Sequence, residues 1–173
     1  MRTFLKRNIG GDFITEQEFR RIIELYSSTV FRTAMCYVKN KSDADDIMQD
    51  VFLKLYTYGG VFESDMHIKA WLIRVTVNSC KNLLKSYWYR FSAPIENAEN
   101  VPEKQSEDEY LLSVIMKLGR KNRAVLYMHY YEGYSIKDIS SLMGMSETAV
   151  TSQLYRSRKR LKQLLLKEGY DEQ

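Results

Sequence analysis

The placement of proline limits the folds open to this chain more than any other feature of its sequence. The 173 residues include two prolines, Pro94 and Pro102, and both lie in one acidic stretch. Proline removes a backbone donor and clashes with the preceding turn, so it breaks helices. The long segments on either side contain none, and they also lack the sustained period-two alternation of strands. The sequence therefore predicts an all-α chain without strands.

Charge divides the chain at the same place. Residues 1–90 carry 14 Lys/Arg and 10 Asp/Glu, residues 91–110 carry one Lys and six acids, and residues 111–173 carry 11 Lys/Arg and six acids. Two basic segments thus flank an acidic connector, and basic domains of this size commonly bind nucleic acid. We predict two small helical domains, 10–90 and 107–168, joined by a flexible acidic linker at 91–106.

The second segment has the pattern of a helix-turn-helix. Ile136, Ile139 and Leu142 are spaced as the buried face of a short helix. Gly144 follows, and glycine can adopt the positive φ that a sharp turn demands. Ser146 then suits the N-cap of the next helix. In a helix-turn-helix this next helix enters the major groove of DNA.

The outer side of that next helix suits contacts with duplex DNA. Short hydroxyls come first and basic groups follow, which fits base edges and phosphates respectively. The candidate DNA-contacting residues are Thr148, Thr151, Ser152, Tyr155, Arg156 and Lys159. The alternative is a helical hairpin whose basic face is only solvated, but the glycine, the cap and the order of side chains favour DNA binding.

The first segment contains an acidic helix pattern with three interpretations. Asp46 and Asp50 stand four residues apart, on one helix face. They could be a catalytic or metal-binding pair, a solvated acidic face, or a docking face for a basic partner. Neither histidine, His67 or His129, lies near them in the sequence. We therefore expect no catalytic residue, no metal site and no cofactor, and we expect that the protein is not an enzyme.

Four motifs, in order along the chain, resemble the extracytoplasmic-function (ECF) sigma factors of the sigma-70 family. They are residues 44–52, read as ADDIMQDVF; residues 70–78, AWLIRVTVN; residues 132–135, EGYS; and residues 142–158, which continue the helix-turn-helix. The chain departs from the family pattern in four places: Asp50 stands for glutamate, Gly119 for proline and Ser140 for alanine, and residues 81–85, KNLLK, replace the frequent D-x-x-R ending. The last change bears on which promoter sequence is read. We expected the changes at Gly119 and Ser140 to touch no contact surface.

The resemblance implies two surfaces on the first domain. The first would dock on the clamp helices of core RNA polymerase and comprises Asp45, Asp46, Gln49, Asp50, Phe52 and Leu53. The second would hold the melted promoter element and comprises Tyr58, Phe62, Lys69, Arg74, Asn78, Lys81 and Lys85. Trp71 falls on the apolar stripe, so we interpret it chiefly as a core residue. The run Tyr87-Trp88-Tyr89 has no assigned role.

The expected function is therefore that of an alternative sigma factor, with core RNA polymerase and promoter DNA as partners. The resemblance also implies an anti-sigma factor, which is often membrane-anchored. The main alternative is a helix-turn-helix regulator whose first domain senses a ligand or dimerises, and an enzyme acting on nucleic acid is a weaker one. The N-terminus lacks the apolar run of a signal peptide, and no segment is apolar enough to enter a membrane. We expect a cytoplasmic protein.

Overall fold

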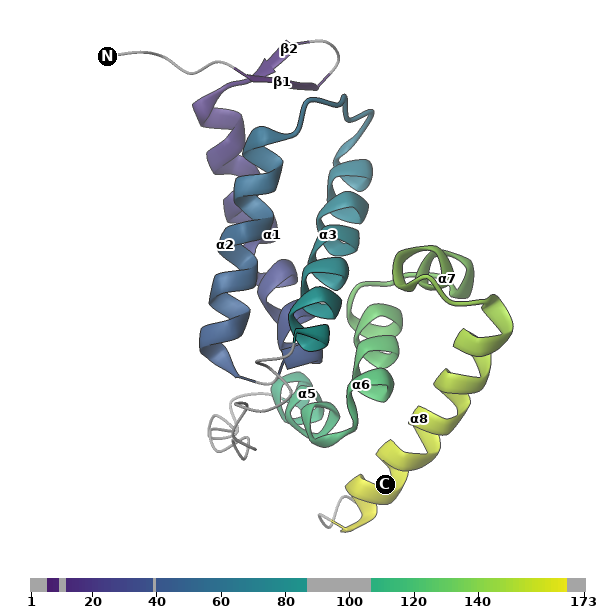
Figure 1. Ribbon diagram of the computed structural model, residues 1–173. Coiled ribbons are helices and arrows are strands. Elements are labelled where there is room, and N and C mark those ends of the chain that lie inside the picture. The colour runs from purple at the N-terminus through teal and green to yellow at the C-terminus, as the bar shows by residue number, and fades with distance from the viewer. Residues whose placement is uncertain (1–5, 10–11, 39, 87–106, 168–173) are drawn as a thin grey trace. The chain divides into compact units, whose positions relative to one another are not determined.

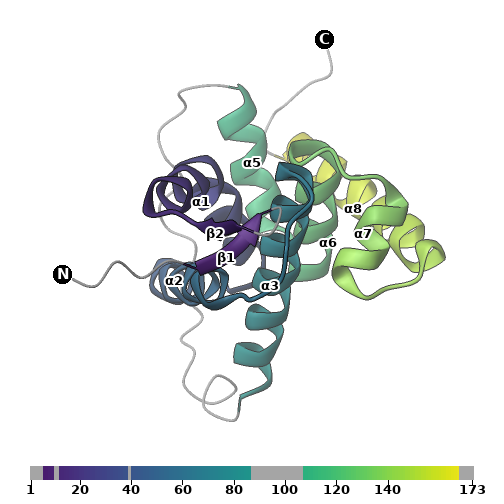
Figure 2. The same cartoon turned by 90° about the horizontal axis from the view of Figure 1, so that it is seen from above.

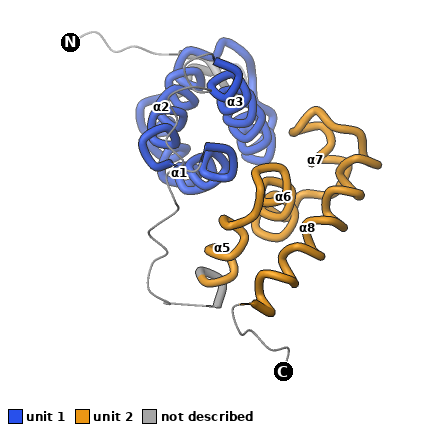
Figure 3. The backbone as a smooth tube through the Cα atoms, turned by 60° about the horizontal axis from the view of Figure 1, so that its bottom comes forward, with its two compact units in different colours: residues 1–89 blue, residues 90–173 orange. Residues whose placement is uncertain are grey.

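The structure is a computed structural model that describes residues 6–9, 12–38, 40–86 and 107–167. The chain separates into two compact units, residues 1–89 and residues 90–173 (Figure 3). Both units are built from helices. The predicted linker at 91–106, and the run Tyr87-Trp88-Tyr89, lie outside the described residues.

A short hairpin near the N-terminus corrects the expectation that the chain has no strands. Strand β1 (Lys6–Ile9) pairs antiparallel with β2 (Asp12–Ile14), with an irregularity between Arg7 and Ile9 (Figure 1). These strands of four and three residues are too short to display an alternating pattern. Two glycines, Gly10 and Gly11, separate them in the sequence and were the available signal. Strand β2 contacts the first helix of the unit.

Three long helices form the first unit: α1 (Glu16–Val38), α2 (Lys41–Thr57) and α3 (Asp65–Lys85). Each helix contacts the other two, and the helices run side by side (Figures 1 and 2). Their inward stripes form one apolar core because apolar residues recur at helical spacing. Fully buried members of this core include Ile22, Val30, Ala44, Val51, Leu55, Ile68, Leu72 and Val77.

Side-chain caps fix where these helices begin. Thr15 Oγ1 accepts from the backbone N–H of Glu18 at 3.1 Å, and Ser64 caps α3 through the N–H of His67. The cap of α2 is Asn40, whose Oδ1 accepts from the N–H of Asp43 at 2.7 Å. Helix α2 therefore begins at Lys41, directly after its cap. Each cap satisfies a backbone donor that has no partner within the helix.

The second unit contains four α-helices and one π-helical turn in the described residues. They are α5 (Glu107–Lys117), α6 (Arg120–Leu126), the π-helix η1 (Tyr127–Tyr131), α7 (Ile136–Met143) and α8 (Glu147–Lys167). Helices α5, α6 and α7 all pack against the long helix α8. The core includes Val114, Ile115, Val125, Leu126, Ile139, Val150 and Leu154.

Helices α7 and α8 form the helix-turn-helix that the sequence predicts. Ser135 and Asp138 make a reciprocal capping box at the start of α7. Gly144 ends α7 with φ 63° and ψ 47°, the left-handed conformation that glycine adopts without a Cβ penalty. Ser146 then caps α8, accepting from the N–H of Ala149 at 3.1 Å. The predicted turn at Gly144 and the predicted cap at Ser146 are confirmed.

Ser140, which we expected to be incidental, holds the turn of the helix-turn-helix. Its hydroxyl donates to the carbonyl of Met145 at 2.8 Å, and its own carbonyl accepts from the N–H of Met145 at 3.0 Å. Alanine could make the second bond but not the first. The serine therefore fastens the residue after Gly144 to the last turn of α7.

Two further features of the described residues concern the cysteines and the apolar character of the helices. Cys36 and Cys80 are both buried and neither is in a disulfide bond, and burial raises the pKa of the Cys80 thiol to about 12. Among the described helices, none is long and apolar enough to cross a membrane.

Candidate nucleic-acid interface

The outer face of α8 carries the residues predicted to contact duplex DNA. Thr148, Thr151, Ser152, Tyr155, Arg156 and Lys159 are all exposed, whereas Val150 and Leu154 on the opposite side are buried. The helix presents hydroxyls in its first turns and cations further along, as the sequence indicated. Because α7 and the turn fix where α8 begins, the whole row is presented as one surface.

A buried polar network lies beneath this face, and sequence reasoning missed it. Asn122 of α6 and Gln153 and Ser157 of α8 are all buried. Asn122 Oδ1 accepts from Gln153 Nε2, and Ser157 Oγ lies 3.1 Å from the same oxygen and 2.7 Å from the carbonyl oxygen of Gln153. The available signal was their spacing, because Gln153 and Ser157 are four apart on the side of the helix that carries Val150.

Residues 156–162 of α8, RSRKRLK, form a basic run. Two of its arginines are held by different neighbours. Arg156 Nη2 donates to Gln153 Oε1 at 3.2 Å. Arg158 Nε donates to the phenol oxygen of Tyr130 at 2.7 Å, and its guanidinium carbon lies 5.7 Å from the centre of that ring. Tyr130 belongs to η1, and π-helical turns of this kind frequently lie at functional sites. The run is therefore partly ordered before any ligand binds.

The exposed face of α2 carries most of the residues predicted to dock on polymerase. Asp46 and Gln49 are exposed, Asp45 is half-buried, and Leu53 is 63% exposed, which is unusual for a leucine. Phe52 departs from the expectation because its side chain is only 8% exposed and packs in the core. It supports α2 from inside the unit and is not part of the exposed face.

Asp50 also belongs to a polar contact between α2 and α3. Lys54 Nζ donates to Asp50 Oδ2 at 2.5 Å and to Ser79 Oγ at 2.9 Å, and Ser79 Oγ donates to the same carboxylate oxygen at 3.1 Å. These groups line a shallow pocket of about 300 Å³ together with Asp43, Asp46, Ile47, Asn82 and Leu83. The carboxylate is half-exposed, so a partner's basic group can still reach its outer side.

An aromatic cluster occupies the connection between α2 and α3. The ring of Tyr58 lies 4.8 Å from that of Trp71 and 5.1 Å from that of Phe62, measured between centroids. Phe62, predicted to touch melted DNA, is 1% exposed and is therefore a core residue. Tyr58 and Trp71 are half-buried and retain accessible ring surface. A Cβ on Gly60 would lie 2.5 Å from the Tyr58 ring, so this glycine leaves room for the tyrosine.

Helix α3 carries the basic residues of the same predicted surface. Arg74, Asn78 and Lys85 are exposed, and Lys69 and Lys81 are half-buried. Burial and the neighbouring Lys85 lower the pKa of Lys81. Positive charge is thus crowded along this helix, and a bound polyanion would relieve the crowding.

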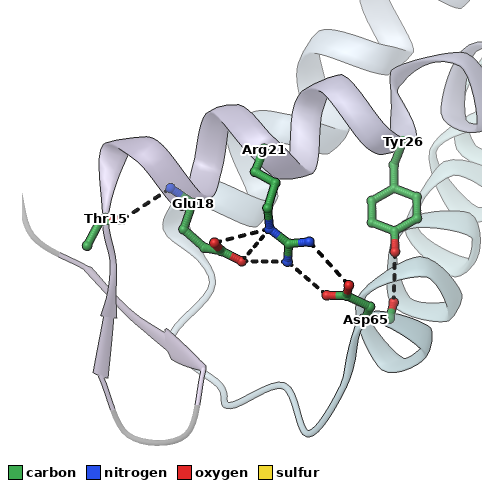
Figure 4. A network of polar contacts seen from close by, with 5 residues as sticks. All are labelled: Thr15, Glu18, Arg21, Tyr26 and Asp65. Atoms are coloured by element: carbon green, nitrogen blue, oxygen red, sulfur yellow. Dashed lines mark hydrogen bonds and ion pairs between the residues drawn. The ribbon is translucent and has the colours of Figure 1, made fainter.

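An ion cluster ties the start of α1 to the start of α3 (Figure 4). Arg21 donates to both oxygens of Asp65, at 2.9 and 3.2 Å, and to the Glu18 carboxylate at 2.6 to 3.1 Å. The hydrogen bonds from Arg21 lower the pKa of Asp65. Tyr26 Oη donates to the Asp65 carbonyl at 3.3 Å. The cluster is exposed and fixes the beginning of α3, which follows the aromatic connection.

The described residues contain no group of three or more His, Cys, Asp or Glu side chains that could hold a metal ion. Asp46 is exposed and Asp50 is half-exposed.

Comparison with known proteins decides between the remaining interpretations. Residues 22–90 match the family described as Sigma-70 region 2, and residues 108–161 match Sigma-70, region 4. The ECF RNA polymerase sigma factor SigM of Mycobacterium tuberculosis is 31% identical over 165 residues, which cover 93% of this chain and 82% of the relative. The chain belongs to the ECF sigma factors.

Other relatives agree with this assignment. The ECF sigma factor SigM of Bacillus subtilis is 26% identical to this sigma factor, with 87% of this chain and 97% of the relative covered. The fold also resembles that of the sigma factor RpoE from Bartonella quintana, solved in complex with the anti-sigma factor NepR, with a TM-score of 0.68 at 19% identity. That match covers 86% of this chain and 97% of RpoE. This sigma factor therefore directs transcription from selected promoters, and the helix-turn-helix regulator is not favoured.

Proposed function

We propose that the two units divide promoter recognition between them, with the tether at 91–106 setting their spacing. The observation that carries this proposal is the opposite charge of two exposed helix faces. Helix α2 of the first unit presents Asp46, Gln49 and the exposed Leu53, and α8 of the second unit presents a row of hydroxyls and cations. An acidic face with an apolar member suits a basic protein partner, and a basic face suits DNA.

The α2 face is the proposed docking surface for core RNA polymerase. It comprises Asp46, Gln49, Asp50 and Leu53, with Asp45 at its edge. Charged groups around an exposed apolar side chain give register and encounter rate, while burial of the leucine contributes affinity. Phe52 contributes indirectly because it holds α2 against the core.

The connection after α2, together with α3, is the proposed surface for the melted promoter element. Opening DNA costs stacking energy, and aromatic side chains that stack on exposed bases offset part of that cost. Tyr58 provides an accessible ring next to Trp71, and Phe62 supports both from below. Lys69, Arg74, Asn78, Lys81 and Lys85 would follow the phosphates of the same strand.

Helix α8 is the proposed reader of the distal promoter element, through Thr148, Thr151, Ser152, Tyr155, Arg156 and Lys159. Two weak contacts joined by a tether gain effective concentration, so the distance between the two DNA elements becomes part of the specificity. The site of action is the cytoplasm, where polymerase and chromosome meet.

An anti-sigma factor is the proposed regulator. The sigma factor RpoE of Bartonella quintana has been solved in complex with the anti-sigma factor NepR, which supports a partner of the same class here. Such a partner would act by covering the α2 face or the DNA-contacting faces. Whether it is membrane-anchored depends on the partner and not on this chain.

Reconstitution with sigma-free core polymerase tests the proposal. Purified protein is mixed with core enzyme, and transcripts from a library of DNA fragments are sequenced. Asp46→Arg should abolish complex formation and all new transcripts, because it places a like charge against a basic partner. Glu24→Arg changes an exposed acid on α1 by the same charge and should leave both intact. A docking variant that forms the complex like wild type would refute the α2 surface.

A further inference from the structure

Arg156 is linked to the interior of the second unit by a continuous chain of hydrogen bonds. Asn122, which is 3% exposed, accepts from the amide nitrogen of Gln153. The amide oxygen of Gln153 then accepts from Arg156 Nη2 at 3.2 Å. The chain runs from a buried side chain of α6 to an exposed side chain of α8 through one glutamine.

The glutamine is suited to this link because its amide has a donor end and an acceptor end. Gln153 Nε2 donates to Asn122 Oδ1, and Gln153 Oε1 accepts from the Arg156 guanidinium. Ser157 Oγ lies 3.1 Å from Asn122 Oδ1 and 2.7 Å from the Gln153 carbonyl oxygen, and its single hydrogen can be donated to one of the two at a time. Burial strengthens these directional bonds, because water does not compete with them.

An arginine on a helix surface normally samples many rotamers, and ordering it on binding costs free energy. We propose that Gln153, oriented by Asn122, is a positioning residue that holds the Arg156 guanidinium in place for promoter DNA. The inference rests on the proposed function of α8 as the reader of the distal element. It adds two residues that do not touch DNA themselves and act through Arg156.

Arg158 offers a contrast on the same helix. Its partner is Tyr130 of η1 and not the buried network. A change that removes the Tyr130 hydroxyl should therefore have no coupling to Arg156. Tyr130→Phe serves as the matched control, because it also deletes one polar partner of an α8 arginine.

The test is a double-mutant cycle in the holoenzyme. The full chain is combined with core polymerase, and affinity is measured on a promoter that the wild-type holoenzyme has selected from a random-sequence library. Gln153→Met keeps the length of the side chain and removes both ends of the amide. It should weaken binding by about threefold to tenfold in the wild-type background and have no further effect in the Arg156→Ala background. Gln153→Glu keeps an acceptor for Arg156 but removes the donor to Asn122, so it should also weaken binding, because Asn122 no longer orients the side chain.

The outcomes separate the inference from the function on which it rests. An equal loss from Gln153→Met in both backgrounds would mean that Gln153 only shapes the helix, and the positioning role would be wrong. An Arg156→Ala variant with unchanged promoter affinity would instead refute the proposed DNA contact. Tyr130→Phe should have the same effect in both backgrounds.

A measurement on the wild-type chain tests the proposal even if the Gln153→Met variant does not fold. Nitrogen relaxation of the arginine Nε groups reports how mobile each guanidinium is on the fast timescale. Arg156 should be more restricted than Arg160, which is exposed on the same helix. Equal mobility of the two side chains in the free protein would overturn the proposal without any substitution.

Discussion

The two units differ in where they place their polar contacts between helices. In the first unit these contacts are at the surface, where Arg21 meets Asp65 and Lys54 meets Asp50 and Ser79. Its described buried polar residues are two threonines, Thr33 and Thr76. The second unit has a surface contact as well, between Arg158 and Tyr130, but it also has internal ones, with Asn122, Arg123, Gln153 and Ser157 all buried. The first unit has polar contacts between helices only at its surface, among the described residues. The second unit has a buried polar network within its apolar core.

The difference follows from what each unit must hold in place. Apolar packing tolerates small shifts because the hydrophobic effect has no direction. Buried hydrogen bonds do have a direction, and leaving one unmade is costly. The second unit therefore holds α8, the proposed DNA-reading helix, against α6 through the hydrogen bond between Gln153 and Asn122. Arg123 of α6 donates to the Leu118 carbonyl at 3.1 Å and ties α6 to the residue that follows α5.

The largest expected effect is the loss of the buried polar network of the second unit. Asn122→Ala would leave the Gln153 amide without its buried acceptor and should destabilise this unit by about 2–3 kcal/mol. Hydrogen exchange should then lose protection in α6 and α8, while α1 to α3 stay protected. Asn82→Ala, an exposed asparagine of α3, is the control and should change stability by less than about 0.5 kcal/mol. Equal loss of protection in both units would contradict the conclusion that the buried polar network stabilises only the second unit.

Two glycine substitutions, one in each unit, are expected to change stability by less than Asn122→Ala. Gly144→Ala forces a Cβ into a conformation with φ 63° and should cost about 1–2 kcal/mol of the stability of the second unit. Gly60→Ala meets only the far end of the Tyr58 ring, 2.5 Å from the new Cβ, so the ring can move aside.

The two glycine variants are distinguished by different measurements. Thermal unfolding should detect the loss in Gly144→Ala. Fluorescence of Trp71, in a Trp88→Phe background, should change in Gly60→Ala because Tyr58 moves away from the indole. A large loss of stability in Gly60→Ala, without a change in fluorescence, would show that its backbone and not the ring requires glycine.

Features that depend on neighbouring residues in the sequence could be predicted, whereas features that depend on distant pairs could not. The helix-turn-helix depends on local signals: a capping serine, an apolar spacing, and a glycine at the turn. All of these are readable in the chain, and the structure contains Ser135, Gly144 and Ser146 in those roles. Similarly, the absence of proline from residues 10–90 was sufficient to predict that the first unit is helical.

Features that depend on distant pairs were not predictable in this way. The spacing of Gln153 places it on the inner side of α8, but its partner Asn122 lies 31 residues earlier, and no local pattern reports that pairing. Phe52 and Phe62 were assigned to contact surfaces from the family resemblance, yet the core of the first unit buries both. The hairpin of β1 and β2 escaped because its strands are shorter than the alternation that identifies them.

The smallest expected effect concerns the surface clamp between α1 and α3. Arg21→Gln or Asp65→Asn should cost about 0.5–1 kcal/mol, since both side chains are exposed and screened by solvent. The pKa of Asp65 is lowered by Arg21, so the folded state favours the charged carboxylate. This stabilisation is therefore present above the ordinary pKa of an aspartate, near pH 4, and is lost as pH falls through the lower folded pKa.

Urea unfolding of the wild type and of Asp65→Asn, repeated from pH 7 down to pH 3, measures this contribution. The difference between the two proteins should shrink as pH falls, and also as salt rises at pH 7. Arg20→Gln provides the control, because Arg20 pairs only within α1, with Glu16 at 2.7 Å, and does not join two helices. A difference that persists at pH 3 and in high salt would mean that Asp65 stabilises α3 by capping its first turn, and the clamp between helices would not be what orders the first unit.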